Sequence, residues 1–570
     1  MEEKVTPLFA LRHSAAHLLA QAVTELYPET KLTIGPVTEH GFFYDFLPEK
    51  NFTIDDLPAI EKRMHELAKK NYEIRGGQVP KAEASALYPN NQFKQELIDG
   101  IPGETVGIYY QGDFFDLCRG GHVERLGEIK HFRLTAVSGS YWRADRSGIA
   151  LQRITGIAFL TKEDMDAYFE RVEEAKKYDH RTLGPELDLF SFHEESAGGV
   201  FFHPKGTKIF HELLAWSRHL QEKDGYVEIK TPLLNHESLY KTSGHYDNYK
   251  ENAYEVMVEG HPHWIRPMNC PSCVLFFKQK PHSYRELPMR IAEYGLCHRY
   301  ELSGVLHGLF RVRSFTQDDA HIFCMPAQLE DEIVKVLELT QKIYKPFGFT
   351  ELKIAVATRP IKSMGTDEMW SQSISSLTKG LDTLNLDYEM KDGEGAFYGP
   401  KIEIQIEDRL GRLWQCGTVQ VDFNMPHNFK IGVVQSDQSK AEPVIIHRAI
   451  YGSIERFMGI LIEHTKGHLP FWLSPVQMTV LTITDKQEAG AREYQKQLQA
   501  AGFRVEIDAS SDKISAKIRR SQLSKIPMML VVGGREIEQG VVTVRRSDGS
   551  QESGVAIDAL IEKAKEMLLY

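Results

Sequence analysis

Apolar residues recur at helical spacing in two long segments of the chain, which predicts two amphipathic helices. The first segment covers residues 8–27, and its apolar face consists of Leu11, Ala15, Leu18, Leu19, Ala22 and Leu26. The second covers residues 205–224, with an apolar face of Ile209, Phe210, Leu213, Leu214 and Leu220. Gly225 stops this second helix, and the apolar run at residues 227–229 predicts a strand directly after it.

A third helical pattern marks a boundary between domains. Residues 163–181 are rich in Glu and Lys, and their apolar face is limited to Met165, Tyr168, Phe169 and Val172. A helix of this composition connects domains more readily than it fills a core. We therefore assign residues 1–162 to a first domain and residues 163–182 to a linker helix.

The chain beyond the linker divides into a large middle domain and a small last domain. Residues 291–323 predict a hairpin of two strands around a loop at residues 303–308, and strand and helix patterns then alternate to about Trp472. Pro475 marks the next boundary, after which three strands alternate with two helices, at residues 476–484, 488–501, 503–507, 513–522 and 528–532. This alternation is typical of an α/β domain with a largely parallel sheet. The middle domain is assigned to residues 183–473 and the last to residues 474–570.

The composition fits a globular protein of several domains. The chain has 570 residues, of which 42% are hydrophobic and 26% charged, and this length suggests about three to five domains. The formal net charge of −11 argues mildly against a protein that depends on phosphate contacts over its whole surface. It leaves room for a basic face confined to one region.

Cysteine usage and the N-terminus indicate a reduced, cytoplasmic compartment. Six cysteines in so long a chain do not resemble a disulfide framework. Arg12, His13 and His17 interrupt the apolar residues that a signal peptide would need. No apolar run approaches the length of a membrane span.

Three segments of the middle domain occur in an order that carries a resemblance. They are residues 225–232 (GYVEIKTP), 297–301 (CHRYE) and 452–456 (GSIER). Each alone is weak, since an Arg-x-Glu is more often a solvated pair. Together and in order they resemble the three motifs of class II aminoacyl-tRNA synthetases.

The resemblance implies an ATP site, with Mg²⁺ bound alongside the nucleotide. Arginine suits this chemistry because its planar fork binds phosphate through two contacts and never loses its charge. Arg299 would hold the α-phosphate, Arg456 the γ-phosphate and Arg311 the triphosphate. Glu301 would accept from the adenine amino group, Phe315 would stack on the ring and Gln415 would complete the floor. On residue type alone, Phe315 reads better as a core aromatic on a strand.

Three further segments narrow the resemblance to the threonyl-tRNA synthetase family. They are residues 266–271 (RPMNCP), 315–321 (FTQDDAH) and 444–449 (VIIHRA), and they imply that Cys270, His321 and His447 bind one Zn²⁺ per chain. A thiolate and two imidazoles leave one position of a tetrahedral zinc open for a substrate. The spacing alone would not reveal this site, because the three residues are far apart in the sequence.

The same family implies the remaining residues of the threonine site. Asp319 would accept from the threonine hydroxyl, and a further family string lies at residues 395–401 (GAFYGPK). Threonine-binding residues would be Met268, Gln317, Asp319, Tyr398 and Gln420. Catalytic residues would be Arg299, Lys401, Gln420 and His245. By residue type alone, His245 reads equally well as a surface loop histidine.

A zinc site that reads an amino group and a hydroxyl cannot reject serine well, so a second, hydrolytic site is expected. His13 and His17 are four residues apart and therefore share one helix face, and residues 116–122 (DLCRGGH) add Cys118 and His122. The set resembles the editing domain of threonyl- and alanyl-type enzymes, with His13, His17, Lys94, Asp116, Cys118 and His122 as editing residues. The same residue types also fit a zinc site, or packing on a helix. The family usually has proline where this chain has Gly121.

The last domain resembles the anticodon-binding domain of class IIa synthetases. Unpaired bases are read by stacking and by hydrogen bonds to their edges, and the family positions correspond to Ser511, Arg519, Glu536 and Arg545. The family often has asparagine where this chain has Ser511. As charged or polar surface residues, all four would otherwise be unremarkable.

The sequence therefore predicts a multidomain α/β and α+β protein. It would combine an N-terminal editing domain, an antiparallel class II catalytic sheet and a C-terminal α/β anticodon-binding domain. Expected partners are tRNA(Thr), ATP, L-threonine and a second copy of the chain in a homodimer. Many bacterial members carry a small ubiquitin-like domain ahead of the editing domain, and this sequence starts without it. The alternatives are a non-catalytic, RNA-binding paralogue and a freestanding metallohydrolase that acts on aminoacyl-tRNA.

Overall fold

The chain divides into two units. The computed structural model describes residues 5–38, 41–145, 148–408 and 411–570. One unit comprises Met1–Glu173 and the other Glu174–Tyr570. The boundary falls within helix α5 (Lys162–Lys177), none of whose residues is buried. The predicted linker helix therefore coincides with the division between the units.

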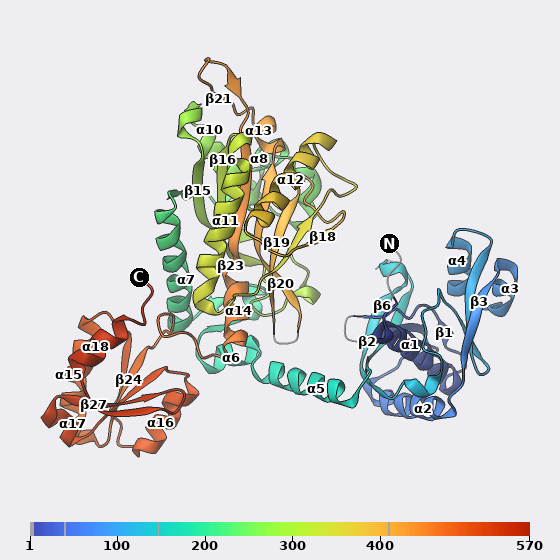
Figure 1. Ribbon diagram of the computed structural model, residues 1–570, viewed down its shortest axis with the longest axis horizontal. Helices are drawn as coiled ribbons and strands as arrows, with labels where there is room; N and C mark the ends of the chain where they lie inside the picture. Colours follow the sequence, from blue (N-terminus) through green and yellow to red (C-terminus); the bar gives the residue numbers. More distant parts are fainter. Residues whose placement is uncertain (1–4, 39–40, 146–147, 409–410) are drawn as a thin grey trace. The chain divides into compact units, whose positions relative to one another are not determined.

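A central helix organises the first unit (Figure 1). Helix α1 (Pro7–Leu26) begins where the Thr6 side chain accepts the Phe9 N–H, 3.1 Å away, and most of its residues from Ala10 to Val23 are buried. It packs against α2 (Leu57–Lys70) and a four-stranded antiparallel sheet in the order β1-β2-β7-β6. These strands are β1 (Lys31–Leu32), β2 (Gly41–Leu47), β7 (Ala150–Phe159) and β6 (His131–Tyr141).

A second, smaller sheet brings the candidate cysteine loop back to α1. Its strands are β3 (Ile74–Pro80), β4 (Thr105–Gln111) and β5 (Phe114–Leu117), and the helices α3 (Lys81–Leu87) and α4 (Gln92–Gly100) connect β3 to β4. Strand β5 ends one residue before Cys118. The loop that follows is tied to α1, because the Val123 N–H donates to Ser14 Oγ at 3.1 Å.

An eight-stranded sheet forms the centre of the second unit. Its order is β10-β15-β16-β23-β20-β19-β17-β18, and every pairing is antiparallel except the outer β10–β15 and β17–β18 pairs. The strands are β10 (Tyr226–Glu228), β15 (Met289–His298), β16 (Ser314–Cys324), β23 (Val444–Ser453), β20 (Leu413–Asp422), β19 (Lys401–Glu407), β17 (Lys353–Ala357) and β18 (Glu389–Lys391). The predicted antiparallel sheet and the hairpin at residues 291–323 are thereby confirmed.

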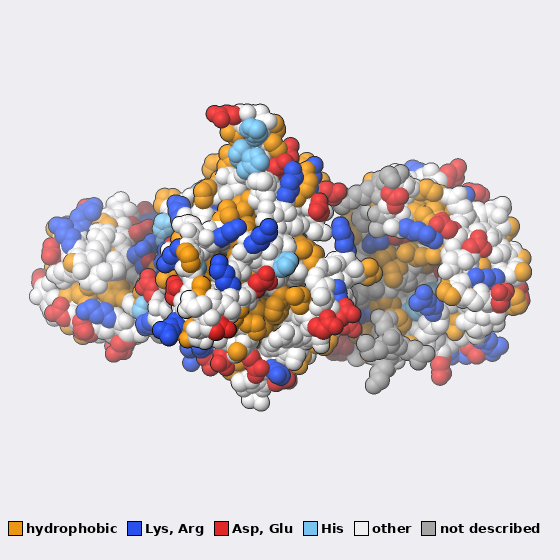
Figure 2. All heavy atoms as spheres, turned by 90° about the horizontal axis from the view of Figure 1, so that it is seen from above, with side chains coloured by type: hydrophobic (Ala, Val, Ile, Leu, Met, Phe, Trp, Pro, Cys, Tyr) orange, Lys and Arg blue, Asp and Glu red, His pale blue; other side chains and the backbone are white. Residues whose placement is uncertain are grey.

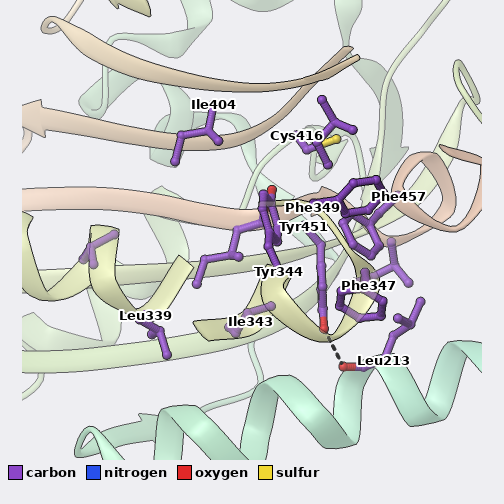
Figure 3. Close-up of a cluster of buried hydrophobic side chains, with 14 of the residues drawn as sticks. Leu213, Leu339, Ile343, Tyr344, Phe347, Phe349, Ile404, Cys416, Tyr451 and Phe457 are labelled. Carbon is purple, nitrogen blue, oxygen red and sulfur yellow. Dashed lines mark hydrogen bonds between the residues drawn. The ribbon is translucent and has the colours of Figure 1, made fainter. Parts of the chain in front are cut away.

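Helices cover one face of this sheet and leave the other for a site. The covering helices are α7 (Pro204–Lys223), α11 (Leu329–Tyr344), α12 (Asp367–Thr383) and α14 (Ile454–His464). Figure 3 shows the core beneath them, where the Tyr451 hydroxyl donates to the Leu213 carbonyl at 3.2 Å. On β16, Ala320 and Ile322 belong to this core. Because neighbouring strand residues point to opposite faces, Asp319 and His321 point away from it.

Smaller elements surround the open face. These elements include four helices, α8 (Glu237–Thr242), α9 (His245–Tyr249), α10 (Cys270–Lys278) and α13 (Asn424–Asn428), and two three-stranded sheets. One sheet contains β11 (Leu234–His236), β13 (His261–Ile265) and β12 (Tyr254–Val258), and the other β14 (His282–Ser283), β21 (Val433–Val434) and β22 (Lys440–Ala441). At the start of the unit lie α6 (His180–Glu186), β8 (Phe190–Ser191) and β9 (Phe201–Phe202).

The last domain is an α/β fold with a mixed sheet in the order β25-β24-β26-β27-β28. The strands β24 (Met478–Thr482), β25 (Val505–Asp508) and β26 (Met528–Val532) are parallel, as predicted. The antiparallel strands β27 (Val541–Arg546) and β28 (Gln551–Ala556), which the hydrophobic pattern did not reveal, extend the sheet. Its helices are α15 (Glu488–Ala500), α16 (Ile514–Leu523), α17 (Gly534–Gln539) and α18 (Ile557–Lys565).

The described residues bear on two expectations, the absence of a membrane-spanning helix and the distribution of charge. Among them, no helix has the length and apolarity needed to cross a membrane. Lys and Arg are interspersed with Asp and Glu on the face seen in Figure 2, in keeping with a net charge of −11.

Candidate active sites

The open face of the large sheet contains a cavity of about 520 Å³. Side chains from β16, β20 and β23 line it, together with residues of α9, α10 and α14 and of the loop between β15 and β16. All but one of the residues predicted for the zinc, ATP, threonine and catalytic sites border this cavity: His245, Met268, Cys270, Arg299, Glu301, Arg311, Phe315, Gln317, Asp319, His321, Tyr398, Gln415, Gln420, His447 and Arg456.

Lys401 is the one predicted site residue that does not line the cavity. It begins β19, where it pairs in register with Gln420, but its ammonium lies 2.6 Å from Glu403 Oε1. The two side chains are two residues apart and share one face of the strand, so a local ion pair satisfies the lysine.

Cys270, His321 and His447 converge at one end of the cavity. One ligand atom from each lies within 4.8 Å of the other two, and the two imidazole centroids are 4.9 Å apart. His447 Nε2 lies 3.0 Å from Asp422 Oδ2, whereas Nδ1 is buried without a hydrogen-bond partner in the described chain. A carboxylate behind a histidine whose other nitrogen is unpaired fits a metal ligand. This donor set could hold a zinc ion.

Burial favours the uncharged forms of Cys270 and His321. It raises the pKa of the Cys270 thiol well above its usual value, with the Asp319 carboxylate as a further cause, because a thiolate there would lose its hydration. Burial also lowers the pKa of His321 well below its usual value. A neutral imidazole is the form that binds a metal, while the thiol proton must be released when a metal binds.

Several polar side chains that line the cavity beside the three ligands could form further hydrogen bonds with a bound substrate. The Asn269 amide donates to Asp319 Oδ2 at 2.6 Å, which holds this carboxylate at the cavity wall. The Tyr398 hydroxyl donates to Gln420 Oε1. Gln317 Oε1 is buried without a partner among the described residues. An unpaired buried oxygen of this kind is satisfied when a ligand supplies a donor.

The three arginines predicted to bind ATP, Arg299, Arg311 and Arg456, line the same cavity. Arg456 donates from Nε to the Phe310 carbonyl at 2.9 Å and from Nη1 to the Gln415 carbonyl at 3.1 Å. The Arg299 guanidinium carbon lies 5.0 Å from the centroid of Phe315. Arg311 forms an ion pair with Glu301 at 2.9 Å. Three fixed positive charges and an aromatic wall are suited to a nucleotide triphosphate.

Phe315 and His245, whose residue types also fit a purely structural role, both line the cavity. Phe315 is mostly buried yet borders the cavity, so it belongs to a small core cluster and to the site at once. His245 is only 1% exposed, which rules out a surface loop histidine. Ser243 Oγ lies 2.8 Å from His245 Nδ1, and Nε2 is buried without a partner. Burial lowers the pKa of His245 to about 4, so the ring is neutral near pH 7.

Sequence reasoning missed two residues that hold the metal-binding end in place. Asn269, within the family segment at residues 266–271, orients Asp319. Asp422 is fully buried and accepts the Asn424 and Met425 N–H groups at 2.7 and 3.0 Å while it faces His447. It lies two residues after Gln420 and thus on the same strand face, a spacing that could have revealed it.

A second cluster of histidines lies in the first unit. Cys118 Sγ is 3.3 Å from His13 Nε2 and 3.1 Å from His122 Nε2, and His17 completes a group whose ligand atoms lie within 4.8 Å of one another. Burial raises the pKa of Cys118 to about 12 and lowers that of His122 to about 2. The cluster is therefore neutral near pH 7 and offers imidazole nitrogens as bases.

Lys94 and Asp116 form a buried ion pair beside this cluster. The ammonium also donates to the Tyr44 oxygen at 3.0 Å, and the Tyr44 hydroxyl donates to Asp116 Oδ2 at 2.6 Å. Burial lowers the pKa of both His13 and His17; the Lys94 charge adds to this lowering at His17, whereas the Asp116 charge partly offsets it at His13. All six residues predicted for an editing site are thus brought together.

The loop after Cys118 has a backbone that proline could not adopt. Gly120 has a φ of +93° and Gly121 a φ of +83°, whereas proline is restricted to about −65°. At Gly121, where the chain departs from the family pattern, the backbone therefore has a conformation that favours glycine and excludes proline.

The four predicted anticodon residues lie on separate elements of the last domain. Ser511 is in the loop after β25, Arg519 on α16, Glu536 on α17 after β26, and Arg545 on β27. Ser511 and Glu536 both follow carboxyl ends of parallel strands, so they lie at the same edge of the sheet. Arg545 Nε is buried without a partner in the described chain.

Three parts of the sequence match known families. Residues 106–155 match the threonyl and alanyl tRNA synthetase second additional domain. Residues 254–465 match the tRNA synthetase class II core domain (G, H, P, S and T), and residues 477–567 match an anticodon binding domain. The first match includes Asp116, Cys118 and His122, the second covers all strands of the large sheet except β10, and the third falls on the last domain.

Relatives extend this similarity over nearly the whole chain. A threonine–tRNA ligase of Desulfatibacillum aliphaticivorans is 49% identical over 97% of this chain and 87% of its own length. One from Acetivibrio thermocellus is 50% identical over 95% of this chain and 86% of its own. A crystal structure described as the RNA binding domain of threonyl-tRNA synthetase from Cryptosporidium parvum has a TM-score of 0.67, with 42% identity over 69% of this chain and 99% of that chain. The chain therefore belongs to the threonine–tRNA ligase family of class II aminoacyl-tRNA synthetases.

Proposed function

We propose that the protein activates threonine with ATP, transfers it to tRNA(Thr) and hydrolyses seryl-tRNA(Thr) at a separate site. The observation that carries this proposal is the main cavity. It unites a zinc-type donor set, a carboxylate held ready for a hydroxyl, and three arginines suited to a triphosphate. A non-catalytic paralogue would have no need to retain all of these groups in one place.

Zinc at Cys270, His321 and His447 would select threonine. When bound, the ion supplies a coordination position that an amino group and a β-hydroxyl can fill, which valine, lacking the hydroxyl, cannot do. A purely apolar pocket separates such isosteres only about a hundredfold. Asp319, held by Asn269, would accept from the threonine hydroxyl, and Gln317 and Tyr398 would lie near the amino group.

The arginines would bind ATP and lower the repulsion between the threonine carboxylate and the α-phosphate. Arg299 would contact the α-phosphate, and Arg456 and Arg311 the remainder of the triphosphate with Mg²⁺. Arg311 and Glu301 form an ion pair that would open when ATP binds. Glu301 would then accept a hydrogen bond from the adenine amino group, and Arg311 would contact the triphosphate. His245, neutral and with a free Nε2, would assist acyl transfer to the tRNA terminus.

The histidine cluster of the first unit would edit mischarged tRNA. His13, His17 and His122 are uncharged near pH 7 and could position and deprotonate a water, with Lys94 and Asp116 stabilising the developing charge. The same four ligands could instead hold zinc. Metal analysis of the full chain separates the two readings, because two zinc ions per chain would favour the metal site and one would favour a metal-free editing site.

The remaining partners follow from the last domain and from an exposed apolar surface. Ser511, Arg519, Glu536 and Arg545 would read the anticodon. Exposed apolar residues include Val227 on the edge strand β10 and Leu234, two residues after the first class II motif. We propose that a second copy of the chain covers them in a homodimer. Cytoplasmic localisation remains our proposal from cysteine usage.

Charging assays test the whole proposal. Purified protein with tRNA(Thr), ATP and Mg²⁺ should form threonyl-tRNA and should not accumulate seryl-tRNA. Sedimentation should give twice the chain mass, and Leu234→Asp should shift it toward the monomer. Absence of charging in a folded, zinc-loaded sample would contradict the synthetase activity and favour a regulatory paralogue.

A further inference from the structure

His180 is a fully buried histidine that none of the proposed roles uses. It is the first residue of α6 and has no exposed surface. His180 Nδ1 lies 2.7 Å from Glu463 Oε1 on α14, and the Leu309 N–H donates to Nε2 at 2.9 Å. One imidazole thus joins a helix carboxylate to the backbone of the loop between β15 and β16.

The partners of the ring determine which nitrogen carries the proton. The Leu309 N–H can only donate, so Nε2 must present its lone pair. The proton of the neutral ring is therefore on Nδ1, where it donates to the Glu463 carboxylate. Because both nitrogens have protein partners, the cluster of Asp179, His180 and Glu463 cannot bind a metal through this histidine without losing one of these contacts.

The loop is packed closely against His180 and α14. A Cβ on Gly308, whose φ is +49°, would lie 2.2 Å from His180 Nε2. A Cβ on Gly459 of α14 would lie 2.9 Å from the Phe310 ring. The centroids of the His180 and Phe310 rings are 4.3 Å apart. The loop is thus held between an imidazole and a helix.

The residues held in this way are connected to the triphosphate arginines. Phe310 follows Leu309, and its carbonyl accepts from Arg456 Nε at 2.9 Å. Arg311 is the next residue and lines the cavity. If Leu309 loses its acceptor, the backbone that carries the Phe310 carbonyl and Arg311 loses its tie to His180 and is left with its turn hydrogen bonds with His307.

We propose that His180 is a positioning residue for ATP: through Leu309 it holds Arg311 and Arg456 in the arrangement that receives the triphosphate. This inference rests on the proposed ATP-binding roles of the two arginines. Glu463 orients the ring, and Gly308 and Gly459 provide the space for the close approach.

The proposal can be tested with substitutions of His180 that each replace only one of its two ring nitrogens. The KM for ATP is measured by ATP–pyrophosphate exchange on the full chain. His180→Gln places an amide near Nε2 and keeps an acceptor for Leu309, whereas His180→Asn mimics only Nδ1 and its contact to Glu463. We expect His180→Asn to raise the KM for ATP about tenfold, with the KM for threonine changed less than about twofold. His180→Gln should recover most of the affinity for ATP.

Two further variants make every outcome decisive. His282 is also buried beside a carboxylate, 3.0 Å from Glu286, and does not contact the loop, so His282→Gln should leave the KM for ATP unchanged. Arg456→Ala should raise that KM, and if it does not, the ATP role of Arg456 is wrong. If Arg456→Ala raises it while His180→Asn leaves it unchanged, the positioning role is wrong. Equal effects of His180→Asn, His180→Gln and His282→Gln, or parallel loss of threonine affinity, would also overturn it, since they indicate general destabilisation.

Discussion

At the scale of single residues, unpaired buried atoms mark where ligands belong. His447 Nδ1, His245 Nε2 and Gln317 Oε1 are all buried without a partner among the described residues, and all three side chains line the main cavity. A buried polar atom without a hydrogen bond costs about 1–3 kcal/mol. Such atoms persist where a metal or substrate provides the missing partner, so their concentration in one cavity supports the threonine site.

Cys270→Ser should remove bound zinc and abolish threonine activation while the fold is kept, because a hydroxyl is a poor zinc ligand and differs little in size. Metal analysis and exchange assays on the same sample measure this. Cys273→Ser is the matched control, since Cys273 is a buried thiol on the same helix but outside the metal group. Retained zinc in the Cys270 variant, or its loss in both variants, would count against the ligand assignment.

Asp422→Asn should weaken zinc binding about 10–100-fold, because the amide orients His447 less firmly than a carboxylate does. The contact concerned is the 3.0 Å approach of Asp422 Oδ2 to His447 Nε2. Competition with a chelator of known affinity gives the zinc dissociation constant. An affinity equal to that of the parent protein would show that Asp422 supports only the backbone turn at Asn424.

At the scale of elements, a single carboxylate closes the junction between β23 and α14. Asp318 is 1% exposed and accepts the N–H groups of Ile450, Tyr451 and Gly452 at 2.9–3.2 Å. The next helix begins at Ile454 and carries Arg456 in its first turn. Strand, turn and arginine are therefore held by one side chain on the neighbouring strand β16.

Asp318→Asn should destabilise the catalytic domain by about 1–3 kcal/mol, because an amide donor replaces an acceptor of backbone N–H groups. Burial raises the pKa of Asp318 to about 7. The folded protein thus keeps a proton that the unfolded chain releases above about pH 4, and the contribution of Asp318 to stability falls as the pH rises from about 4 to 7. Thermal unfolding at several pH values measures both effects. A melting temperature equal to that of the parent across this range would contradict the role.

The sequence predicted elements well where one periodicity ran without interruption. The helix expected at residues 8–27 is Pro7–Leu26, and that expected at 205–224 is Pro204–Lys223. The helix expected at residues 163–181 ends instead at Lys177, because the Asp179 side chain accepts the Arg181 N–H at 2.7 Å and begins α6. Strand β28 was missed because nearly all of its residues are exposed and it has no apolar pattern, and β27 because its apolar run ends in Arg545 and Arg546.

The site residues came from the family resemblance rather than from spacing. Cys270, His321 and His447 are far apart in the chain, and only the pairing of β16 with β23 places His321 opposite His447. Such long-range register cannot be read from local pattern. It also explains why His180 escaped notice, since it acts through a loop that is distant in sequence.

At the scale of the whole molecule, two units with separate cores contain the two proposed activities. The histidine cluster belongs to Met1–Glu173 and the main cavity to Glu174–Tyr570, and each unit has its own buried hydrophobic cluster. Stability and chemistry in one unit therefore need not depend on side chains in the other.

His17→Ala should leave threonine charging unchanged and allow seryl-tRNA to accumulate, because only the cluster of the first unit loses a base. Steady-state charging with serine and deacylation of preformed seryl-tRNA(Thr) measure the two effects. Thr24→Ala is a control on the same helix, since the Thr24 hydroxyl contacts only helix carbonyls. A His17 variant that clears seryl-tRNA at the rate of the parent would show that the editing assignment is wrong.

The central claim is that a zinc-dependent cavity selects threonine for activation. The most direct test is amino-acid-dependent ATP–pyrophosphate exchange with threonine, serine and valine, with zinc measured in the same sample. Our account predicts strong exchange with threonine, weaker exchange with serine and none with valine, at one zinc ion in the catalytic site. Equal exchange with valine, or full threonine exchange after zinc has been removed, would contradict it.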